Sequence, residues 1–565
     1  MEKLLLFKKL LLLLLLFSYN IFCFAQYNQE WVARHNGPGN FSDLAHALAV
    51  DQKGNIYVTG SSTGTGTELD YSTIKYNAAG VKLWEAKYNN VANQDDEALA
   101  IAVDHKGNVY VTGRSTGGET GADFATVKYN SAGVQQWATR YAGTGPATSF
   151  DAARDIKVDE KGNVYVTGES VGNLTSFDYA TIKYNSDGFP LWEARYDGPG
   201  QEDFPKALAL DEKGNVYVTG RSAAGTNEEP ELDQDYTTIK YDKNGNQIWL
   251  KRYDGPIAGN LFDEALAIAL DKSGNIYITG RSIGGFDEDL YDYATVKYDG
   301  NGNQKWAARY NGPGNTVDMA FDLAVDNHQN VYVTGASGGE VNSDYATIKY
   351  NANGNELWVR RYNGPANADD NALALALDHL GNVYVTGWSL GPGPGFERQD
   401  FATVKYNAAG IEQWAARYNG PGNGDDIAND IAVDQFGNVY VTGVSTGTGS
   451  GFDFATIKYD QDKRAELISQ IKLLLLRFRL FNIPNPVQST TQIYYDLPWD
   501  GHVSLQVYDM MGKQIATLVN TNRKAGIYSV NFDASALSKG VYNYRITLNT
   551  ETKVWILTKK LIVVK

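Results

Sequence analysis

The stretch Gly107-Asn-Val-Tyr-Val-Thr-Gly113 decides the fold, because the same seven-residue pattern recurs along most of the chain. Successive copies begin 52 to 60 residues apart. A period of this length is typical of a β-propeller, in which each repeat forms one four-stranded blade. The copies begin at Gly54, Gly107, Gly162, Gly214, Gly274, Gln329, Gly381 and Gly437.

Each repeat is expected to supply four strands, A to D. In the second repeat they are Asp96–Val103, Asn108–Thr112, Asp123–Tyr129 and Val134–Tyr141. Strand A is rich in alanine, as the crowded innermost strand of a blade requires. Strand D centres on Trp137, a large apolar side chain suited to the space between blades. Short turns ending in glycine join A to B and C to D, because a tight hairpin needs a residue with positive φ.

The two ends of the repeat region predict how the ring closes. The last repeat ends at Tyr459 with no strand D after it, and an unassigned strand-D sequence, Gln29–His35, precedes the first repeat. We expect this segment to pair antiparallel with Asp453–Tyr459, which leaves no open sheet edge. The chain is therefore predicted to form an eight-bladed, all-β propeller. One tryptophan marks each strand D: Trp31, Trp84, Trp137, Trp192, Trp249, Trp306, Trp358 and Trp414.

The pattern Gly-Asn-Val-Tyr-Val-Thr-Gly, followed by Asp-Tyr-Ala-Thr-Ile-Lys-Tyr-Asn, resembles the bacterial β-propeller repeat called SBBP. The resemblance covers roughly residues 26–459. It implies an extracellular or envelope propeller and no common reaction. That family is usually described as seven-bladed, so eight blades are a departure from it.

Residues 1–25 read as a signal peptide. Lys3, Lys8 and Lys9 form a basic start, and Leu10–Phe17 is an apolar core too short to span a membrane. Cleavage after Ala25 would remove the single cysteine of the chain, so disulfides are not expected to contribute to stability.

The pattern changes after Tyr459. Residues 460–481 are a basic, apolar stretch that we expect to be a packed linker or a first strand, and not a transmembrane anchor. Residues 482–565 alternate polar and apolar residues between glycine turns, which predicts an Ig-like antiparallel β-sandwich.

The same C-terminal residues resemble the type A C-terminal sorting domain of type IX secretion. The matching pieces are Pro484-Asn-Pro486, Val503–Gly512, Gly540–Arg545 and Lys559-Lys560. The usual first box is altered here to Ile483–Val487. The resemblance implies a two-membrane, Bacteroidetes-like bacterium. It also implies recognition by the outer-membrane machinery and passage through the periplasm to the outer cell surface or the medium.

The formal charge of the chain is −16, and it is unevenly distributed. Residues 1–25 carry +2 and the chain from Asp460 onward carries +6, so the propeller region carries about −24. Such an acidic body repels phosphate backbones and anionic membranes, which excludes nucleic acid as the expected partner. We expect a monomer that binds an extracellular glycan or protein.

Strand direction places the variable D–A and B–C loops on one face, here called the long-loop face. The B–C loop is longest in the fourth, fifth and seventh repeats. Binding residues concentrate in such loops. The predicted recognition site is therefore the arc of the long-loop face formed by the fourth, fifth and seventh repeats. Trp388 replaces smaller or charged residues of the other repeats there, and either stacks on a ligand or covers the loop 391–395. The acidic candidates of the arc are Glu228, Glu229, Asp287, Glu288 and Asp289.

Rings of repeated polar residues occupy the same face. Strand geometry predicts that each strand-A aspartate lies near the serine that ends strand B, and that Asp123 faces Arg140 across strands C and D. Eightfold repetition favours a structural role, because a catalytic site needs unlike groups at one place. Calcium coordination is the alternative, and otherwise no cofactor is expected. The strand-A aspartates are Asp43, Asp96, Asp151, Asp203, Asp263, Asp318, Asp370 and Asp426.

Motifs for common catalytic sites are missing from the sequence, so no catalytic residue is predicted. His105, His328 and His379 fall in A–B turns of different repeats and are expected to be solvated. The preferred function is a secreted or surface-displayed binding or adhesion scaffold for a glycan or protein. The alternatives are a polysaccharide hydrolase or lyase with its site at the channel mouth, and a purely structural envelope protein.

Overall fold

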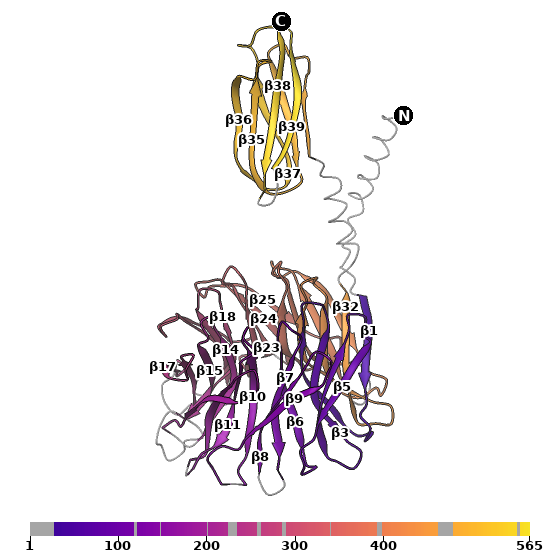
Figure 1. Ribbon diagram of the computed structural model, residues 1–565, viewed down its shortest axis with the longest axis vertical. Coiled ribbons are helices and arrows are strands. Elements are labelled where there is room, and N and C mark those ends of the chain that lie inside the picture. Colours follow the sequence, from indigo (N-terminus) through magenta and orange to yellow (C-terminus); the bar gives the residue numbers. More distant parts are fainter. Residues whose placement is uncertain are drawn as a thin grey trace. The chain divides into compact units, whose positions relative to one another are not determined.

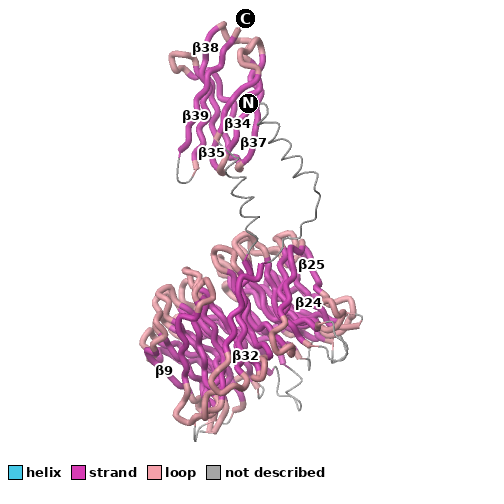
Figure 2. Tube along the Cα trace, turned by 90° about the vertical axis from the view of Figure 1, so that its right-hand side faces the viewer, coloured by secondary structure: helices cyan, strands magenta, loops and turns pink. Residues whose placement is uncertain are grey.

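The computed structural model describes residues 28–117, 121–146, 148–173, 175–199, 202–223, 234–256, 262–284, 290–339, 341–391, 398–460, 478–550 and 554–564. Throughout these residues the chain forms strands and loops without a helix (Figure 2). The chain divides into two compact units, residues 1–461 and 462–565. The predicted signal peptide and residues 461–477 of the predicted linker lie outside the described residues. The last residues of the predicted linker, from Arg479 onward, already belong to the first strand of the second unit.

The first unit is a propeller of eight four-stranded antiparallel sheets (Figure 1). The A strands are β2 (Asp43–Val50), β6 (Asp96–Val103), β10 (Asp151–Val158), β14 (Asp203–Leu210), β18 (Asp263–Leu270), β22 (Asp318–Val325), β26 (Asp370–Leu377) and β30 (Asp426–Val433). The B strands are β3 (Ile56–Thr63), β7 (Val109–Thr116), β11 (Val164–Val171), β15 (Val216–Ala223), β19 (Ile276–Ile283), β23 (Val331–Gly338), β27 (Val383–Leu390) and β31 (Val439–Thr446).

The outer half of each blade follows the same order. The C strands are β4 (Leu69–Tyr76), β8 (Ala122–Tyr129), β12 (Phe177–Tyr184), β16 (Gln234–Tyr241), β20 (Tyr291–Tyr298), β24 (Ser343–Tyr350), β28 (Gln399–Tyr406) and β32 (Phe452–Asp460). The D strands are β5 (Lys82–Tyr88), β9 (Gln135–Tyr141), β13 (Pro190–Tyr196), β17 (Gln247–Tyr253), β21 (Gln304–Tyr310), β25 (Glu356–Tyr362), β29 (Glu412–Tyr418) and, for the eighth blade, β1 (Asn28–His35).

The ring closes as the sequence predicts. Strand β1 pairs antiparallel with β32, with Gln29 opposite Tyr459 and His35 opposite Phe454. Each A strand lies beside the A strands of the two adjacent blades, and β2 contacts both β6 and β30. The A strands therefore surround the central channel, and the eighth blade is built from both ends of the propeller region.

The two glycines of the repeated motif serve different purposes. The final one, such as Gly335, lies so close to strand A that an added Cβ would stand 1.9 Å from the carbonyl oxygen of Met319. Strand A is bulged at this level, between Ala320 and Asp322. The first position instead needs positive φ, which Gln329 adopts at 63° where the other repeats have glycine.

The strand-D tryptophans hold neighbouring blades together. Trp137 packs against Tyr110 of its own blade, with ring centroids 6.3 Å apart, and its Nε1 donates a hydrogen bond of 3.0 Å to the carbonyl of Ser186 in the next blade. Lys128 Nζ donates to the same carbonyl at 2.8 Å. At the seam between the eighth and first blades, Trp31 Nε1 donates the equivalent hydrogen bond to the carbonyl of Ala78, at 3.1 Å.

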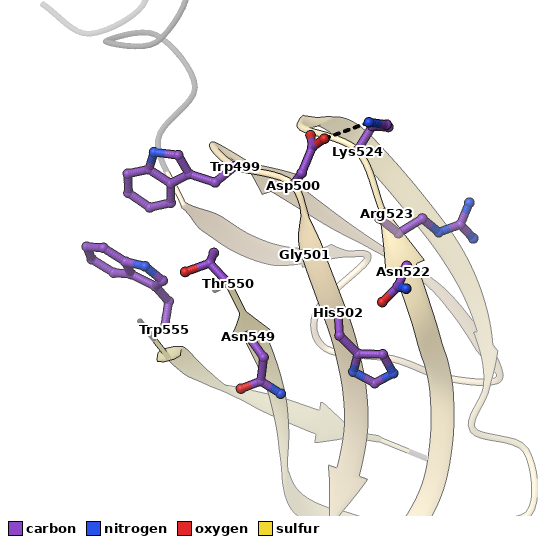
Figure 3. Close-up of a pocket in the computed structure, with 10 residues that line it drawn as sticks. All are labelled: Trp499, Asp500, Gly501, His502, Asn522, Arg523, Lys524, Asn549, Thr550 and Trp555. Atoms are coloured by element: carbon purple, nitrogen blue, oxygen red, sulfur yellow. Dashed lines mark ion pairs between the residues drawn. The ribbon is translucent and has the colours of Figure 1, made fainter. Parts of the chain in front are cut away.

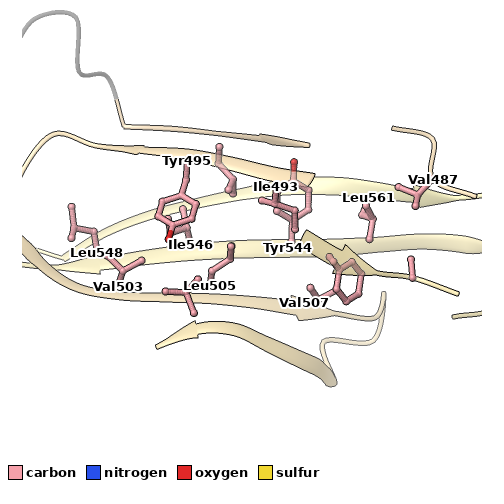
Figure 4. Close-up of a cluster of buried hydrophobic side chains, with 14 of the residues drawn as sticks. Val487, Ile493, Tyr495, Val503, Leu505, Val507, Tyr544, Ile546, Leu548 and Leu561 are labelled. Atoms are coloured by element: carbon pink, nitrogen blue, oxygen red, sulfur yellow. The ribbon is translucent and has the colours of Figure 1, made fainter. Parts of the chain in front are cut away.

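The second unit is an antiparallel sandwich of two sheets. One sheet contains β33 (Arg479–Ile483), β34 (Thr490–Leu497) and β37 (Gly526–Asp533). The other contains β35 (Gly501–Tyr508), β36 (Gln514–Arg523), β38 (Gly540–Asn549) and β39 (Val554–Val563). Figure 4 shows the core between them, which includes Ile493, Tyr495, Val503, Leu505 and Ile546.

Among the described residues, no helix is long and apolar enough to cross a membrane.

Candidate functional site

The polar rings of the long-loop face hold the loops and strands of each blade. Arg140 donates to the carboxylate of Asp123 and to the backbone carbonyl of Ser115, the latter at 2.8 Å. Asp96 stands directly opposite Ser115 in the ladder. This is the geometry that strand direction predicts. Seven blades form the pair: Arg34–Asp453, Arg140–Asp123, Arg195–Asp178, Arg252–Asp235, Arg309–Asp292, Arg361–Asp344 and Arg417–Asp400.

The strand-A aspartates fix the D–A loops. In seven blades the Oδ2 atom accepts a hydrogen bond from a backbone N–H of that loop. Asp263, for example, accepts from Gly255 N at 2.8 Å and from Ile283 N at 3.1 Å. Because its carboxylate is buried, the pKa of Asp263 is raised to about 6. These hydrogen bonds tie the described parts of the D–A loops to the start of strand A.

The residue type differs from blade to blade at a pair of facing positions near the start of strand A and the end of strand B. These two positions lie on the long-loop side of the channel wall, here called the channel mouth. A repeated residue has a structural explanation in each blade, whereas residues that differ from blade to blade can recognise an asymmetric ligand. The facing pairs, in order, are Leu44–Ser61, Glu97–Arg114, Ala152–Glu169, Phe204–Arg221, Glu264–Arg281, Met319–Ala336, Asn371–Trp388 and Ile427–Val444.

Glu264 organises the fourth and fifth blades at the channel mouth. It is 4% exposed and is surrounded by three cations. Arg281 lies 2.7 Å from a carboxylate oxygen, Lys206 3.3 Å and Arg221 3.7 Å. Burial acts to raise the pKa of Glu264, but these cations outweigh it and lower the pKa. The cluster keeps Glu264 ionised and carries a net positive charge.

Aromatic rings support the same guanidinium groups. Arg221 lies 4.5 Å from the ring centroid of Phe204 and 4.9 Å from that of Phe262. Arg281 lies between Phe262 and Tyr291, at 4.8 and 5.1 Å. Cation–π contacts and ion pairs together hold the planar donors in fixed orientations.

A second charged cluster spans the first three blades. Glu97 accepts from Arg114 at 2.7 Å and lies 3.4 Å from His46 Nε2. The His46 contact, followed by Arg114, lowers the pKa of Glu97 to about 2. Arg154 is ion-paired with the buried Glu169, yet its side chain is still 38% exposed. The charged side chains of the channel mouth therefore come from the first five blades.

Trp388 lies at the channel mouth in the seventh blade. It is half-buried and stands between Asn371 and Phe401 in the sheet. The Oδ1 atom of Asn371 is buried without a hydrogen-bond donor among the described residues. The other predicted binding residues, Glu228, Glu229, Asp287, Glu288 and Asp289, lie outside the described residues, as does nearly all of the loop 391–395.

Sequence reasoning missed the basic and aromatic residues of the channel mouth. Arg221 and Arg281 occupy the same position of the repeat as Trp388. Comparing the repeats at that position could therefore have identified them as candidates too. Arg154 and Lys206 sit at the strand-A bulge, where side-chain alternation shifts by one residue. Their orientation therefore does not follow from the pattern.

Deeper in the channel wall, three aspartates tie adjacent blades together. Asp322 accepts hydrogen bonds from Leu323 N at 2.7 Å and from Leu375 N of the next blade at 2.8 Å. Asp155 and Asp430 make the same two contacts in their blades. Desolvation, assisted by the charge of Asp430, raises the pKa of Asp322 to about 7.

Cavities also occur away from the long-loop face. One of about 380 Å³ lies at the seam between the sixth and seventh blades, on the short-turn face, and both His328 and His379 border it. The two histidines belong to adjacent repeats. Their separation along the sequence therefore did not exclude a shared environment.

The sandwich carries an open pocket of about 950 Å³ at one end (Figure 3). Trp499 and Trp555 stack there with ring centroids 4.6 Å apart, and Trp499 is 42% exposed. Across the pocket, Asp500 and Lys524 form an ion pair of 2.9 Å beside Arg523. The pocket therefore combines an aromatic wall with a mainly basic rim.

Comparison with protein families identifies both units. The family described as "Secretion system C-terminal sorting domain" matches residues 483–564. The family described as "Beta-propeller repeat", SBBP, matches residues 39–66, 194–225, 266–287 and 413–449.

Curated relatives are distant. An uncharacterized WD repeat-containing protein of Acanthamoeba polyphaga mimivirus is 24% identical over 74% of this chain and 30% of its own length. The regulatory protein FlaEY of Caulobacter vibrioides is 28% identical over 29% of this chain and 18% of its own length. The chain thus spans less than a third of either relative.

Solved structures show only weak likeness. PorZ, a surface component of the type-IX secretion system of Porphyromonas gingivalis, is 15% identical with a TM-score of 0.33, covering 92% of this chain and 75% of its own. The polysaccharide lyase Uly1 is 10% identical with a TM-score of 0.40, covering 79% and 94%. At these scores the likeness carries no argument about function. The family matches and the described sheets together show a β-propeller that carries SBBP repeats and, at residues 483–564, a secretion-system sorting domain, which indicates export through the periplasm to the cell surface or the medium.

Proposed function

We propose that the exported propeller is a binding protein whose ligand is an extracellular glycan held at the channel mouth. One observation carries this proposal. The positions that break the eightfold repeat cluster at the channel mouth, where they combine guanidinium donors with aromatic rings. Fixed donors and flat apolar faces are the two groups that recognise hydroxyl-rich rings.

The donors are ordered yet accessible. The side chains of Arg114, Arg221 and Arg281 are 34%, 21% and 26% exposed. Their partners Glu97 and Glu264 orient them, so little side-chain entropy is lost when a ligand binds. Trp388 adds an aromatic surface in the seventh blade, next to Asn371.

A hydrolase or lyase is the competing function, and Asp322 is the observation in its favour. A carboxyl group with a pKa near 7 suits general acid catalysis. Both of its oxygens, however, accept backbone N–H groups that tie two blades together. At the channel mouth, Glu97 and Glu264 have lowered pKa values, which suits ion pairing and opposes proton donation.

A glycan array with the mature protein tests the proposal, followed by calorimetry on the best ligand. The repeat itself supplies conservative variants. Arg221→Ala introduces the residue of the sixth blade, and Trp388→Val introduces that of the eighth. Each should weaken binding at least tenfold, while the control Asp187→Asn, in an exposed turn of the short-turn face, should leave it unchanged.

Thermal midpoints check that each variant is folded. If no array glycan binds, or if both variants bind like the wild type, the proposal is wrong. Release of shorter products from a bound polysaccharide would favour the hydrolase or lyase instead.

A further inference from the structure

We propose that Asp178, Asp197 and Asp203 form a calcium site between the third and fourth blades, repeated one seam further on by Asp235, Asp254 and Asp263. In each triad, one carboxylate oxygen from every residue lies within 4.8 Å of the others. Calcium takes oxygen ligands at about 2.3–2.6 Å, so oxygens up to about 5 Å apart can share one ion.

The residues of the first triad come from three places at the long-loop end of the seam. Asp178 begins strand C, Asp197 follows strand D, and Asp203 begins strand A of the next blade. Asp178 and Asp203 are buried, at 3% and 0% exposure, whereas Asp197 is exposed. An ion held there would have buried ligands on one side and solvent access on the other.

A buried oxygen of this triad lacks a donor. Asp178 Oδ2 accepts from Arg195 at 2.7 Å, and Asp203 Oδ2 accepts from Gly198 N at 2.6 Å. The carboxylate of Asp203 also has the Ser222 side chain as a partner. The Oδ1 atom of Asp178 is buried and has no hydrogen-bond donor among the described residues. Buried polar atoms of native proteins normally have partners, and a bound ion would supply one here.

Charge crowding supports the same conclusion. The three carboxylates lie close enough together to repel one another, and two of them are buried. Arg195 offsets one of the three negative charges, which leaves the triad anionic. A divalent cation would neutralise the rest.

The other blades provide an internal comparison. At the position of Asp197, five blades have an asparagine that donates to a second asparagine four residues later. Aspartate occurs there only before the fourth and fifth blades, and both of these seams hold a triad. The same departure from the repeat brings three carboxylates together twice, although in the second triad both oxygens of Asp263 also accept backbone N–H groups.

Three carboxylates at a partly exposed seam predict weak binding. The expected dissociation constant is about 10⁻⁴–10⁻³ M, which is the range of extracellular calcium modules. Calcium should therefore raise the thermal midpoint of the mature protein at millimolar concentrations, because binding to the native state alone stabilises it.

Isothermal titration of the mature protein with CaCl₂, after treatment with EDTA, tests the proposal. The wild type should bind two ions. Asp197→Asn and Asp254→Asn introduce the residue that five blades already have, and each should remove one ion. The double variant should bind none and lose the calcium-dependent rise in midpoint. Asp187→Asn, which changes an exposed turn residue of the same blade, should still bind two.

Midpoints in EDTA separate loss of binding from misfolding. Without calcium the asparagine variants should melt at or above the wild-type temperature, because each removes a repelling carboxylate. The proposal is overturned if the wild type binds no calcium and shows no rise in midpoint. It is also overturned if the double variant binds as the wild type does. Neither result bears on glycan binding, which is measured at a different set of residues.

Discussion

Arg34, in the first strand of the propeller, donates a hydrogen bond of 2.7 Å to Asp453, which lies 419 residues later in its last strand. Arg34 also donates to the backbone carbonyls of Ser445 and Thr446, at 3.1 and 3.2 Å. Every other blade that forms this ion pair does so between strands joined by a short turn. The eighth blade makes the same contacts between the two ends of the ring.

Replacing Arg34 should destabilise the whole propeller. The side chains of Arg34 and Asp453 are 21% and 9% exposed, so Arg34→Met leaves a largely buried carboxylate unpaired. We expect a loss of about 2 kcal/mol, between the values for exposed and buried pairs. Denaturation in guanidinium chloride measures it.

Arg361→Met is the matched control, because it breaks the same pair inside the sixth blade. Both variants should lose similar stability, but only Arg34→Met should make β1 sensitive to protease. Equal resistance of β1 in both variants would contradict a role for Arg34 in closure.

Strand β1 should be replaceable by a separate peptide. A protein lacking residues 1–35 would expose the edge of β32, and open edges pair with other chains. We expect self-association in size-exclusion chromatography. A peptide of residues 28–35 should reverse it by restoring the ladder and the contacts of Trp31 with Tyr76 and Tyr440. The same peptide with Trp31→Ala should be much less effective, and equal rescue by both would argue against this packing.

The contribution of Asp322 to stability should depend on pH. Its pKa is about 7 in the native state and about 4 in an unfolded chain. Between these values the unfolded state releases the proton while the native state keeps it, so the free energy of unfolding falls as pH rises.

Asp322→Ala introduces the residue found in five other blades and removes two accepted hydrogen bonds. It should cost about 1–2 kcal/mol at pH 5 and much less at pH 8. Urea denaturation at both values measures the difference. Asp430→Ala should show the same trend over a narrower range, because the pKa of Asp430 is raised to about 6. A cost that does not change with pH would show that Asp322 does not titrate in this range.

The two glycine positions of the repeated motif should respond in opposite ways to substitution in the sixth blade, where the first of them is occupied by Gln329. Gln329→Gly should stabilise the propeller by about 0.5–1 kcal/mol, because Gln329 adopts a positive φ that glycine tolerates better. Gly335→Ala should lose several kcal/mol or fail to fold, because its Cβ would collide with the backbone of Met319. Thermal denaturation of both variants checks this, and a tolerated Gly335→Ala would mean that strands β22 and β23 can separate.

The sequence was sufficient for features that repeat or that follow from strand direction. Trp31 had no repeat of its own and the last repeat lacked a tryptophan, so closure by β1 was predictable and is confirmed. The facing of Asp123 and Arg140 followed from antiparallel pairing.

Features that depend on a bulge or on two blades at once were not predictable. The bulge after Ala153 shifts the alternation, so the pattern did not place Asp155 against the next blade. The cluster around Glu264 joins residues of two blades that stand at different positions of the repeat. Aligning the repeats does not show which of these positions contact one another across a seam. The loops that carry Glu228 and Asp287 lie outside the described residues, so their role remains a prediction.

The pairing of β1 with β32 also determines how the protein responds to mechanical load. Asn28 lies opposite Asp460, so both ends of the propeller leave from the same end of this two-stranded ladder. A pull through those ends would open the ladder one hydrogen bond at a time, from Asn28 toward His35. If the ends left from opposite ends of the ladder, the pull would instead shear it and load all the hydrogen bonds together. The joint that makes the ring continuous is therefore also where tension opens it first, before strain reaches the other seven blades.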